Sequence, residues 1–118
     1  MTNTFREIQS KISRSNEENG FHEIGNYPPE FQVDYIAKKL LLAVGEISEA
    51  IEELRHGHDP LYRYYREDGK PEGFPSEVAD AVIRLIDIAD ELHLDLEDVI
   101  TEKLAFNATR GEKHGRKF

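Results

Sequence analysis

Apolar residues recur at three- and four-residue intervals through most of this chain, which is the period of an amphipathic α-helix. The first such segment begins at Thr4, which stands three residues before Glu7 in the capping-box spacing. It continues to about Asn19 and is ended by Gly20. The prolines and glycine of residues 21–30 then predict a loop.

A second helix is predicted from about Phe31 or Asp34 to His56, with Gly57 directly after its last turn. Its apolar side chains form one stripe: Ile36, Leu40, Ala43, Val44, Ile47, Ile51 and Leu54. The stripe beside it is acidic and contains Glu46, Glu49 and Glu53.

A polar connection, residues 58–76, follows the second helix and is rich in proline and glycine. Unstructured connections this long are often lids or binding loops. Tyrosines alternate in it with basic residues, a mixture that suits stacking on a base and contact with phosphate: Tyr62, Arg63, Tyr64, Tyr65, Arg66 and Lys70. A surface loop with a short helix of its own is an equally consistent interpretation.

Ser76 is suited to cap a third helix, predicted over about Glu77 to His93, whose apolar residues cover more than half of its circumference. The remaining strip is polar and contains Glu77, Asp80, Arg84, Asp87 and Glu91. Asp95 is suited to cap a fourth helix from about Leu96 to Thr109, which Gly111 ends. One stripe of this helix changes from apolar to polar while it keeps its register: Leu96, Val99, Ile100, Lys103, Asn107 and Arg110.

Four helical segments predict an all-α fold, a four-helix bundle formed by one domain over residues 1–118. The chain is 38% hydrophobic and 33% charged, so its core is modest, and the absence of cysteine excludes disulfides and thiolate metal sites. A net charge of −9 argues against a nucleic-acid partner. Because we find no membrane-length apolar run and no signal-peptide pattern at Met1, we expect no membrane partner and a cytoplasmic location.

Two pairs of acids carry the candidate chemistry, Glu46 with Glu49 and Glu77 with Asp80. Residues three apart share a helix face, so each pair presents two carboxylates together. If the two helices pack side by side, four carboxylates converge, which is tolerable only with a cation between them. Ligands that are all oxygen suit Mg²⁺ or Mn²⁺. The alternative is a solvated acidic face, although Leu42 lies in line with the glutamates of the second helix.

Lys103, Asn107 and Arg110 continue the apolar stripe of the fourth helix, which indicates that they point toward something buried and polar. The alternative is a helix end that emerges into solvent, where a cation interacts favourably with the helix dipole. Five lysines and arginines lie between residues 101 and 118, and a basic segment beside an acidic centre suits a metal with a phosphorylated ligand. The tail, residues 114–118, either folds back over that ligand or is disordered.

The order of these motifs resembles that of the MazG-like, all-α nucleoside triphosphate pyrophosphohydrolases. The resemblance covers about residues 39–118 and rests on both acid pairs and the basic fourth helix, with Lys70–Gly73 and His114–Gly115 in support. It implies a MazG-like bundle that is completed by dimerisation or tetramerisation. It also implies hydrolysis of a (d)NTP to the monophosphate and pyrophosphate, a clearing of the nucleotide pool, with Mg²⁺ as the cofactor and Mn²⁺ as an alternative ion.

The resemblance assigns roles to two sets of residues. The metal ligands are Glu46, Glu49, Glu77 and Asp80. The substrate is contacted by Lys70, Asp87, Lys103, Asn107 and Arg110. The reaction also needs a carboxylate that takes a proton from water, for which Glu49 or Glu53 is spare. The family often has an acid at the position of Gly45, so the number of metals stays open, and Glu53 can compensate in part.

Two other functions remain consistent with the sequence. The chain could be a non-catalytic helical module that binds nucleotide or metal or that dimerises, in which case ligand binds and no product forms. It could also be a structural bundle with solvated acids, whose melting temperature does not respond to Mg²⁺. The identity of the base stays open, because tyrosine and phenylalanine stack on any base.

Overall fold

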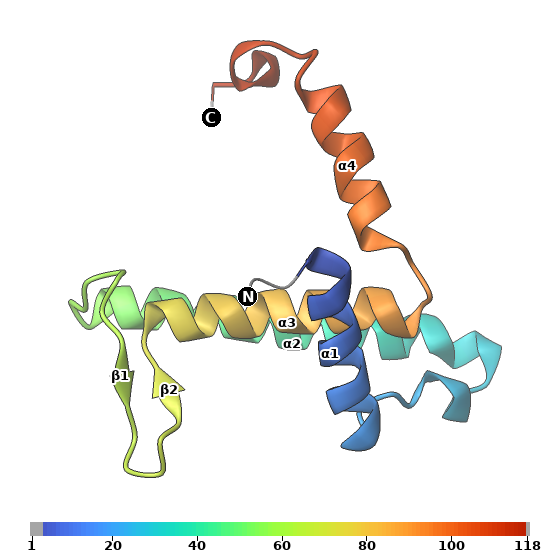
Figure 1. Cartoon of the computed structure of the whole chain (residues 1–118), viewed down its shortest axis with the longest axis horizontal. Coiled ribbons are helices and arrows are strands. Elements are labelled where there is room, and N and C mark those ends of the chain that lie inside the picture. The colour runs from blue at the N-terminus through green and yellow to red at the C-terminus, as the bar shows by residue number, and fades with distance from the viewer. Residues whose placement is uncertain (1–3, 118) are drawn as a thin grey trace.

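Two long helices, α2 (Pro29–Arg55) and α3 (Phe74–Glu91), lie side by side and antiparallel, and they form the frame of the protein (Figure 1). This computed structural model describes residues 4–117 without the side chains of residues 114 and 115, so part of the expectation for the tail lies outside the described residues. Helix α1 (Phe5–Glu18) packs across α3, and a short turn (Ile24–Asn26) precedes α2. Helix α4 (Leu96–Asn107) and a turn (Glu112–Gly115) complete the order.

The N-terminal ends of three helices test the capping residues and helix starts that the sequence predicted. The Thr4 side chain accepts from the Glu7 amide at the start of α1, and the Asp95 side chain accepts from the Asp98 amide at the start of α4, so both predicted caps are confirmed. Helix α2 begins earlier than predicted. Pro29 occupies its first turn, where a proline loses no hydrogen bond because the first amides of a helix have no partner.

The connection between α2 and α3 is a β-hairpin rather than a plain loop. Strand β1 (Tyr64–Tyr65) pairs antiparallel with β2 (Pro71–Glu72). The prediction that Ser76 caps α3 is wrong, because the helix already begins at Phe74 and Gly73 is its N-cap. Gly73 has a φ of 106°, and a Cβ there would lie 2.6 Å from the Tyr62 carbonyl oxygen, so the hairpin closes onto the helix only through glycine.

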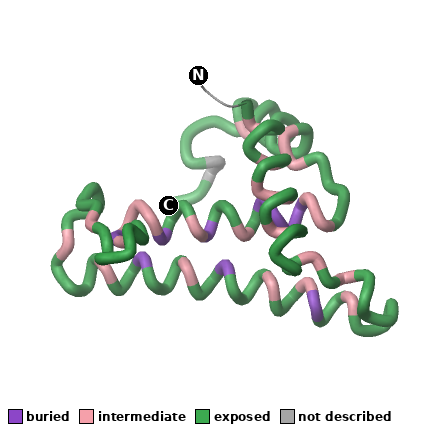
Figure 2. The backbone as a smooth tube through the Cα atoms, turned by 60° about the horizontal axis from the view of Figure 1, so that its bottom comes forward, coloured by how far each residue is buried: buried purple, intermediate pink, exposed green. Residues whose placement is uncertain are grey.

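The core lies mainly where α2 and α3 face each other (Figure 2). Its buried apolar residues are mostly small: Tyr35, Ala43, Ala50, Ala81, Ile86, Ile88 and Ala89. Two acids, Glu77 and Asp87, are buried with them. The polar strip predicted for the third helix therefore faces inward at these two positions. There α3 is covered by α2 and by the loop between α1 and α2.

A large apolar surface is left uncovered by the single chain. Helix α4 points away from the α2–α3 pair in Figure 1, and none of its residues is buried. Leu41 on α2 is 67% exposed and Leu104 on α4 is 64% exposed. The radius of gyration is 16.9 Å, against about 13.5 Å for a compact domain of this length. The accessible surface is 9163 Å², against about 6,600 Å² for a compact monomer of this mass.

The all-α class is confirmed, since helices dominate the described part of the chain and the strands are two residues each. Helix α3 packs against both α1 and α2, whereas α4 contacts the rest of the described chain only near its start, where Glu97 pairs with Arg6 of α1 over 2.7 Å. Among the described residues no helix combines the length and the apolarity needed to cross a membrane.

Candidate functional site

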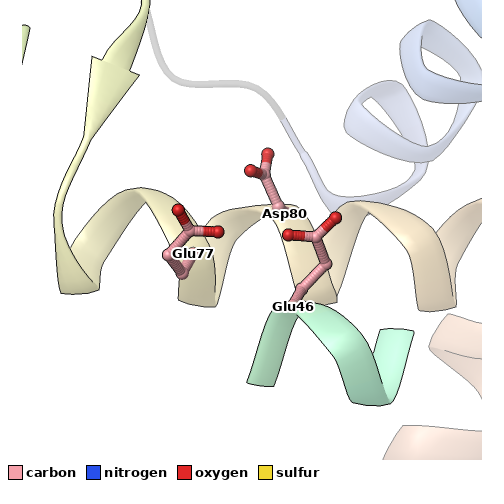
Figure 3. A group of neighbouring side chains, drawn as sticks. All are labelled: Glu46, Glu77 and Asp80. Atoms are coloured by element: carbon pink, nitrogen blue, oxygen red, sulfur yellow. The ribbon is translucent and has the colours of Figure 1, made fainter. Parts of the chain in front are cut away.

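Three of the predicted metal ligands converge between α2 and α3. Glu46 comes from α2, and Glu77 and Asp80 come from α3 (Figure 3). One carboxylate oxygen of each lies within 4.8 Å of the others. The three-residue spacing places the two α3 acids on one face of their helix, and antiparallel packing brings Glu46 against that face. We call Glu46, Glu77 and Asp80 the central acid cluster.

Glu77 is the most buried member of the central acid cluster. It is only 8% exposed, and its Oε2 atom is buried without a hydrogen-bond partner. Burial, together with hydrogen bonding and charge from Glu49 and Glu46, raises its pKa to about 8. A carboxylate is stable here at neutral pH only if it holds a proton or if a cation replaces that proton.

The other two members titrate in opposite directions. Burial and the neighbouring charge of Glu46 raise the pKa of Asp80. Burial alone would also raise the pKa of Glu46, but hydrogen bonds from Arg84 and Glu77 outweigh it and lower that pKa. The Arg84 Nε donates to Glu46 Oε1 over 2.9 Å. Sequence reasoning gave Arg84 no role, although its position one turn after Asp80 was a usable signal.

The remaining two predicted acids lie at the edge of this cluster. Glu49 is exposed and lies within hydrogen-bonding reach of Glu77. Glu53, one turn further along α2, is held by two neighbours instead. Its Oε2 is 2.5 Å from His58 Nδ1, and its Oε1 accepts from the Tyr64 hydroxyl over 2.8 Å. These bonds, led by the one to His58, lower the pKa of Glu53.

An open cleft of about 360 Å³ adjoins the central acid cluster. It is lined by residues of α1, the turn after it, α2, the hairpin and α3: Asn16, Phe21, Glu46, Lys70, Asp80, Ile83 and Arg84. Lys70 is therefore brought to the acids as predicted, and Arg84 adds a second cation. The contribution of Asn16 and Phe21 had no sequence signal, because the resemblance begins after the first helix.

Asp87 is not brought to the central acid cluster. It is 4% exposed and belongs to a separate polar group at the other end of the α2–α3 interface. His22 Nε2 lies 2.6 Å from one of its oxygens, and Lys39 Nζ lies 3.5 Å from the other. Lys39 also pairs with Glu91 over 2.9 Å, and the Tyr35 hydroxyl donates to Glu91. The fold thus gives Asp87 structural partners within the chain.

The three predicted substrate contacts on α4 and directly after it also lie apart from the acids. Helix α4 points away from the α2–α3 pair (Figure 1). Lys103 and Asn107 are not among the residues that line the cleft of their own chain. Arg110 lies over the Phe106 ring at 5.6 Å. Within residues 4–117, Lys103 and Arg110 form no ion pair.

The donor set determines what this site can hold. It offers only carboxylate oxygens, the ligands preferred by Mg²⁺ and Mn²⁺, and an orphaned buried oxygen that such an ion would satisfy. The adjoining cleft places two cationic side chains near the acids, an arrangement that suits a phosphorylated ligand bridged by metal. Comparison of the chain with family models, with curated proteins and with solved structures finds no match.

Proposed function

We propose that this protein is a MazG-like nucleoside triphosphate pyrophosphohydrolase, which uses Mg²⁺ or Mn²⁺ to hydrolyse a (d)NTP to the monophosphate and pyrophosphate. The observation that carries the proposal is the central acid cluster, with its buried and unpartnered Glu77 oxygen beside a cationic cleft. The order of motifs in the sequence supports the same activity. A cytoplasmic location is part of the proposal, since that is where such a nucleotide pool lies.

In this proposal Glu46, Glu77 and Asp80 hold the divalent ion. The bound ion supplies neutralisation of the triphosphate charge and a lowered pKa of bound water. Glu49 is exposed beside the cluster and takes the proton of the attacking water. Lys70 and Arg84 line the cleft and neutralise phosphate oxygens, with Arg84 also orienting Glu46. No covalent intermediate is needed.

The active form in this proposal is a homodimer or a homotetramer. The chain exposes about 2,600 Å² more surface than a compact monomer of its mass. For two chains this is about 5,200 Å², at the upper end of the total area that obligate dimers bury. The excess includes apolar surface on α2 and α4, such as that of Leu41 and Leu104. Since α4 cannot bring Lys103 and Asn107 to the acids of its own chain, a second copy supplies them, and opposite charges favour that arrangement.

The test is release of pyrophosphate from a panel of canonical and modified (d)NTPs, with and without Mg²⁺ or Mn²⁺. We expect release only with metal, and loss of at least about a hundredfold in rate for Asp80→Asn, with its helical content unchanged. Glu52→Gln is the matched control, because Glu52 is an exposed acid of α2 outside the cluster and should retain the wild-type rate. If the folded wild-type protein binds nucleotide and metal but hydrolyses nothing, it is a binding module and the proposed enzyme activity is refuted.

A further inference from the structure

A second group of carboxylates lies on the hairpin side of the central acid cluster. It consists of Glu53 from α2, Glu72 from β2 and Glu77 from α3. One carboxylate oxygen of each lies within 4.8 Å of the others. The three elements meet here because β2 leads directly into α3, which packs against α2, at the end of the helix pair from which the hairpin extends (Figure 1).

Glu77 belongs to both groups, and its state points to a ligand. Its Oε2 atom is buried and accepts no hydrogen bond from any described residue, while the residue as a whole is 8% exposed. An unpaired buried acceptor destabilises the fold, and more strongly if it is charged. The nearest groups on both sides of Glu77 are other carboxylates, which cannot donate when ionised, so a cation is the partner that satisfies them together.

Glu53 is already oriented as a ligating carboxylate is in known metal sites. His58 and the Tyr64 hydroxyl each hold one of its oxygens, which leaves further lone pairs on both. Groups of this kind fix the ligand and are themselves part of a metal site. The Tyr64 hydroxyl donates the hydrogen bond to Glu53 Oε1 over 2.8 Å. Glu53 therefore stays an acceptor facing Glu72 and Glu77.

Glu72 is the third ligand and is not committed to a close partner. Its nearest cations are Lys70 Nζ at 3.7 Å and Arg66 Nη1 at 4.0 Å, both on exposed side chains. Ion pairs this long to exposed cations contribute little. A divalent cation between Glu53, Glu72 and Glu77 can displace them without breaking a strong interaction.

We propose that Glu53, Glu72 and Glu77 form a second site for a hard divalent cation such as Mg²⁺ or Mn²⁺, which shares Glu77 with the central acid cluster. The site ties strand β2 to α2 and α3, so the cation orders the hairpin over the cleft. It also gives Glu53 the role of a metal ligand and leaves Glu49 as the proton acceptor. The proposal assumes that the central cluster binds metal, as the proposed function requires, but it does not assume turnover.

The experiment counts Mn²⁺ bound per full-length chain, from the electron paramagnetic resonance signal of free Mn²⁺ at pH 8.5 without nucleotide. We expect two ions in the wild type. Glu72→Gln and Glu53→Gln should each retain one, with affinity at the lost site reduced at least about tenfold. Asp80→Asn should also retain one, because it affects only the central cluster. Glu52→Gln should bind two, and circular dichroism confirms that each variant is folded.

Limited trypsin digestion gives a second measurement that separates the two sites. Arg63 and Arg66 lie in the hairpin region, and Mn²⁺ should slow cleavage after them in the wild type and in Asp80→Asn, but not in Glu72→Gln. A wild type that binds one ion or none, or a Glu72→Gln variant that still binds two, overturns the second site. Two bound ions without any hydrolysis leave the second site standing and refute only the proposed enzyme.

Discussion

Replacing Glu77 by glutamine should stabilise the protein when no metal is present, although the substitution removes a buried residue of the candidate site. The side chain is 8% exposed and has a pKa of about 8, whereas a glutamate in the unfolded chain has a pKa of about 4.3. When an acidic group has a higher pKa in the folded state than in the unfolded state, the protein loses stability as the pH rises between these two pKa values. The slope is about 1.4 kcal/mol per pH unit.

The magnitude at pH 7 follows from that slope. The interval from about 4.3 to pH 7 corresponds to at most about 3 to 4 kcal/mol, and relaxation of the neighbouring carboxylates reduces it. We therefore expect Glu77→Gln to gain about 2 kcal/mol, or roughly 8 °C in melting temperature. With Mg²⁺ at a hundred times its dissociation constant, the wild type should gain about 2.7 kcal/mol for each bound ion and the variant almost nothing.

The assay is thermal unfolding followed by circular dichroism at one fixed protein concentration, in EDTA and in Mg²⁺, at pH 5.5 and pH 7. The difference between variant and wild type in EDTA should be smaller at pH 5.5. That pH lies only about 1.2 units above the pKa of a glutamate in the unfolded chain, so protonating Glu77 on folding costs less than at pH 7. Glu52→Gln should melt like the wild type in every condition. The reasoning is refuted if Glu77→Gln melts lower than the wild type in EDTA and Mg²⁺ raises both equally.

Three further changes test the fold around the site. Lys39→Met leaves Asp87 and Glu91 without their shared cation, so denaturant unfolding should show a loss of about 3 to 5 kcal/mol; a loss below 1 kcal/mol would contradict the ion-pair account. Tyr35→Phe removes the hydroxyl that donates to Glu91 and should cost about 1 to 2 kcal/mol in the same assay, with no change if the hydroxyl is instead solvated. Leu41→Asp should convert the oligomer to monomer in analytical ultracentrifugation, and an unchanged sedimentation coefficient would exclude α2 from the interface.

Much of the fold could be predicted because its signals are local. The caps at Thr4 and Asp95 and the helical apolar period need no information about distant residues. The convergence of Glu46 with Glu77 and Asp80 followed from one added assumption, that two helices with inward stripes pack side by side. Helix periodicity then leaves little freedom in which side chains meet.

The features that sequence reasoning missed depend on long-range packing. The partners of Asp87 are His22 from the loop before α2 and Lys39 from α2, and nothing in the period of α3 identifies them. The meeting of Glu72 with Glu53 depends on how the hairpin is attached to α3, where Gly73 approaches the Tyr62 carbonyl closely. The apolar stripes predicted the inward face of each helix but could not distinguish burial within one chain from burial against a second copy.

The most direct test of the account is to identify the product of hydrolysis of a (d)NTP by the wild-type protein and Mg²⁺ in ¹⁸O-labelled water, using ³¹P NMR. The account predicts monophosphate and pyrophosphate as the only products, with the label on the monophosphate because water attacks the α-phosphorus. Diphosphate with inorganic phosphate would contradict it. So would an intact triphosphate after incubation with folded protein that has bound its metal.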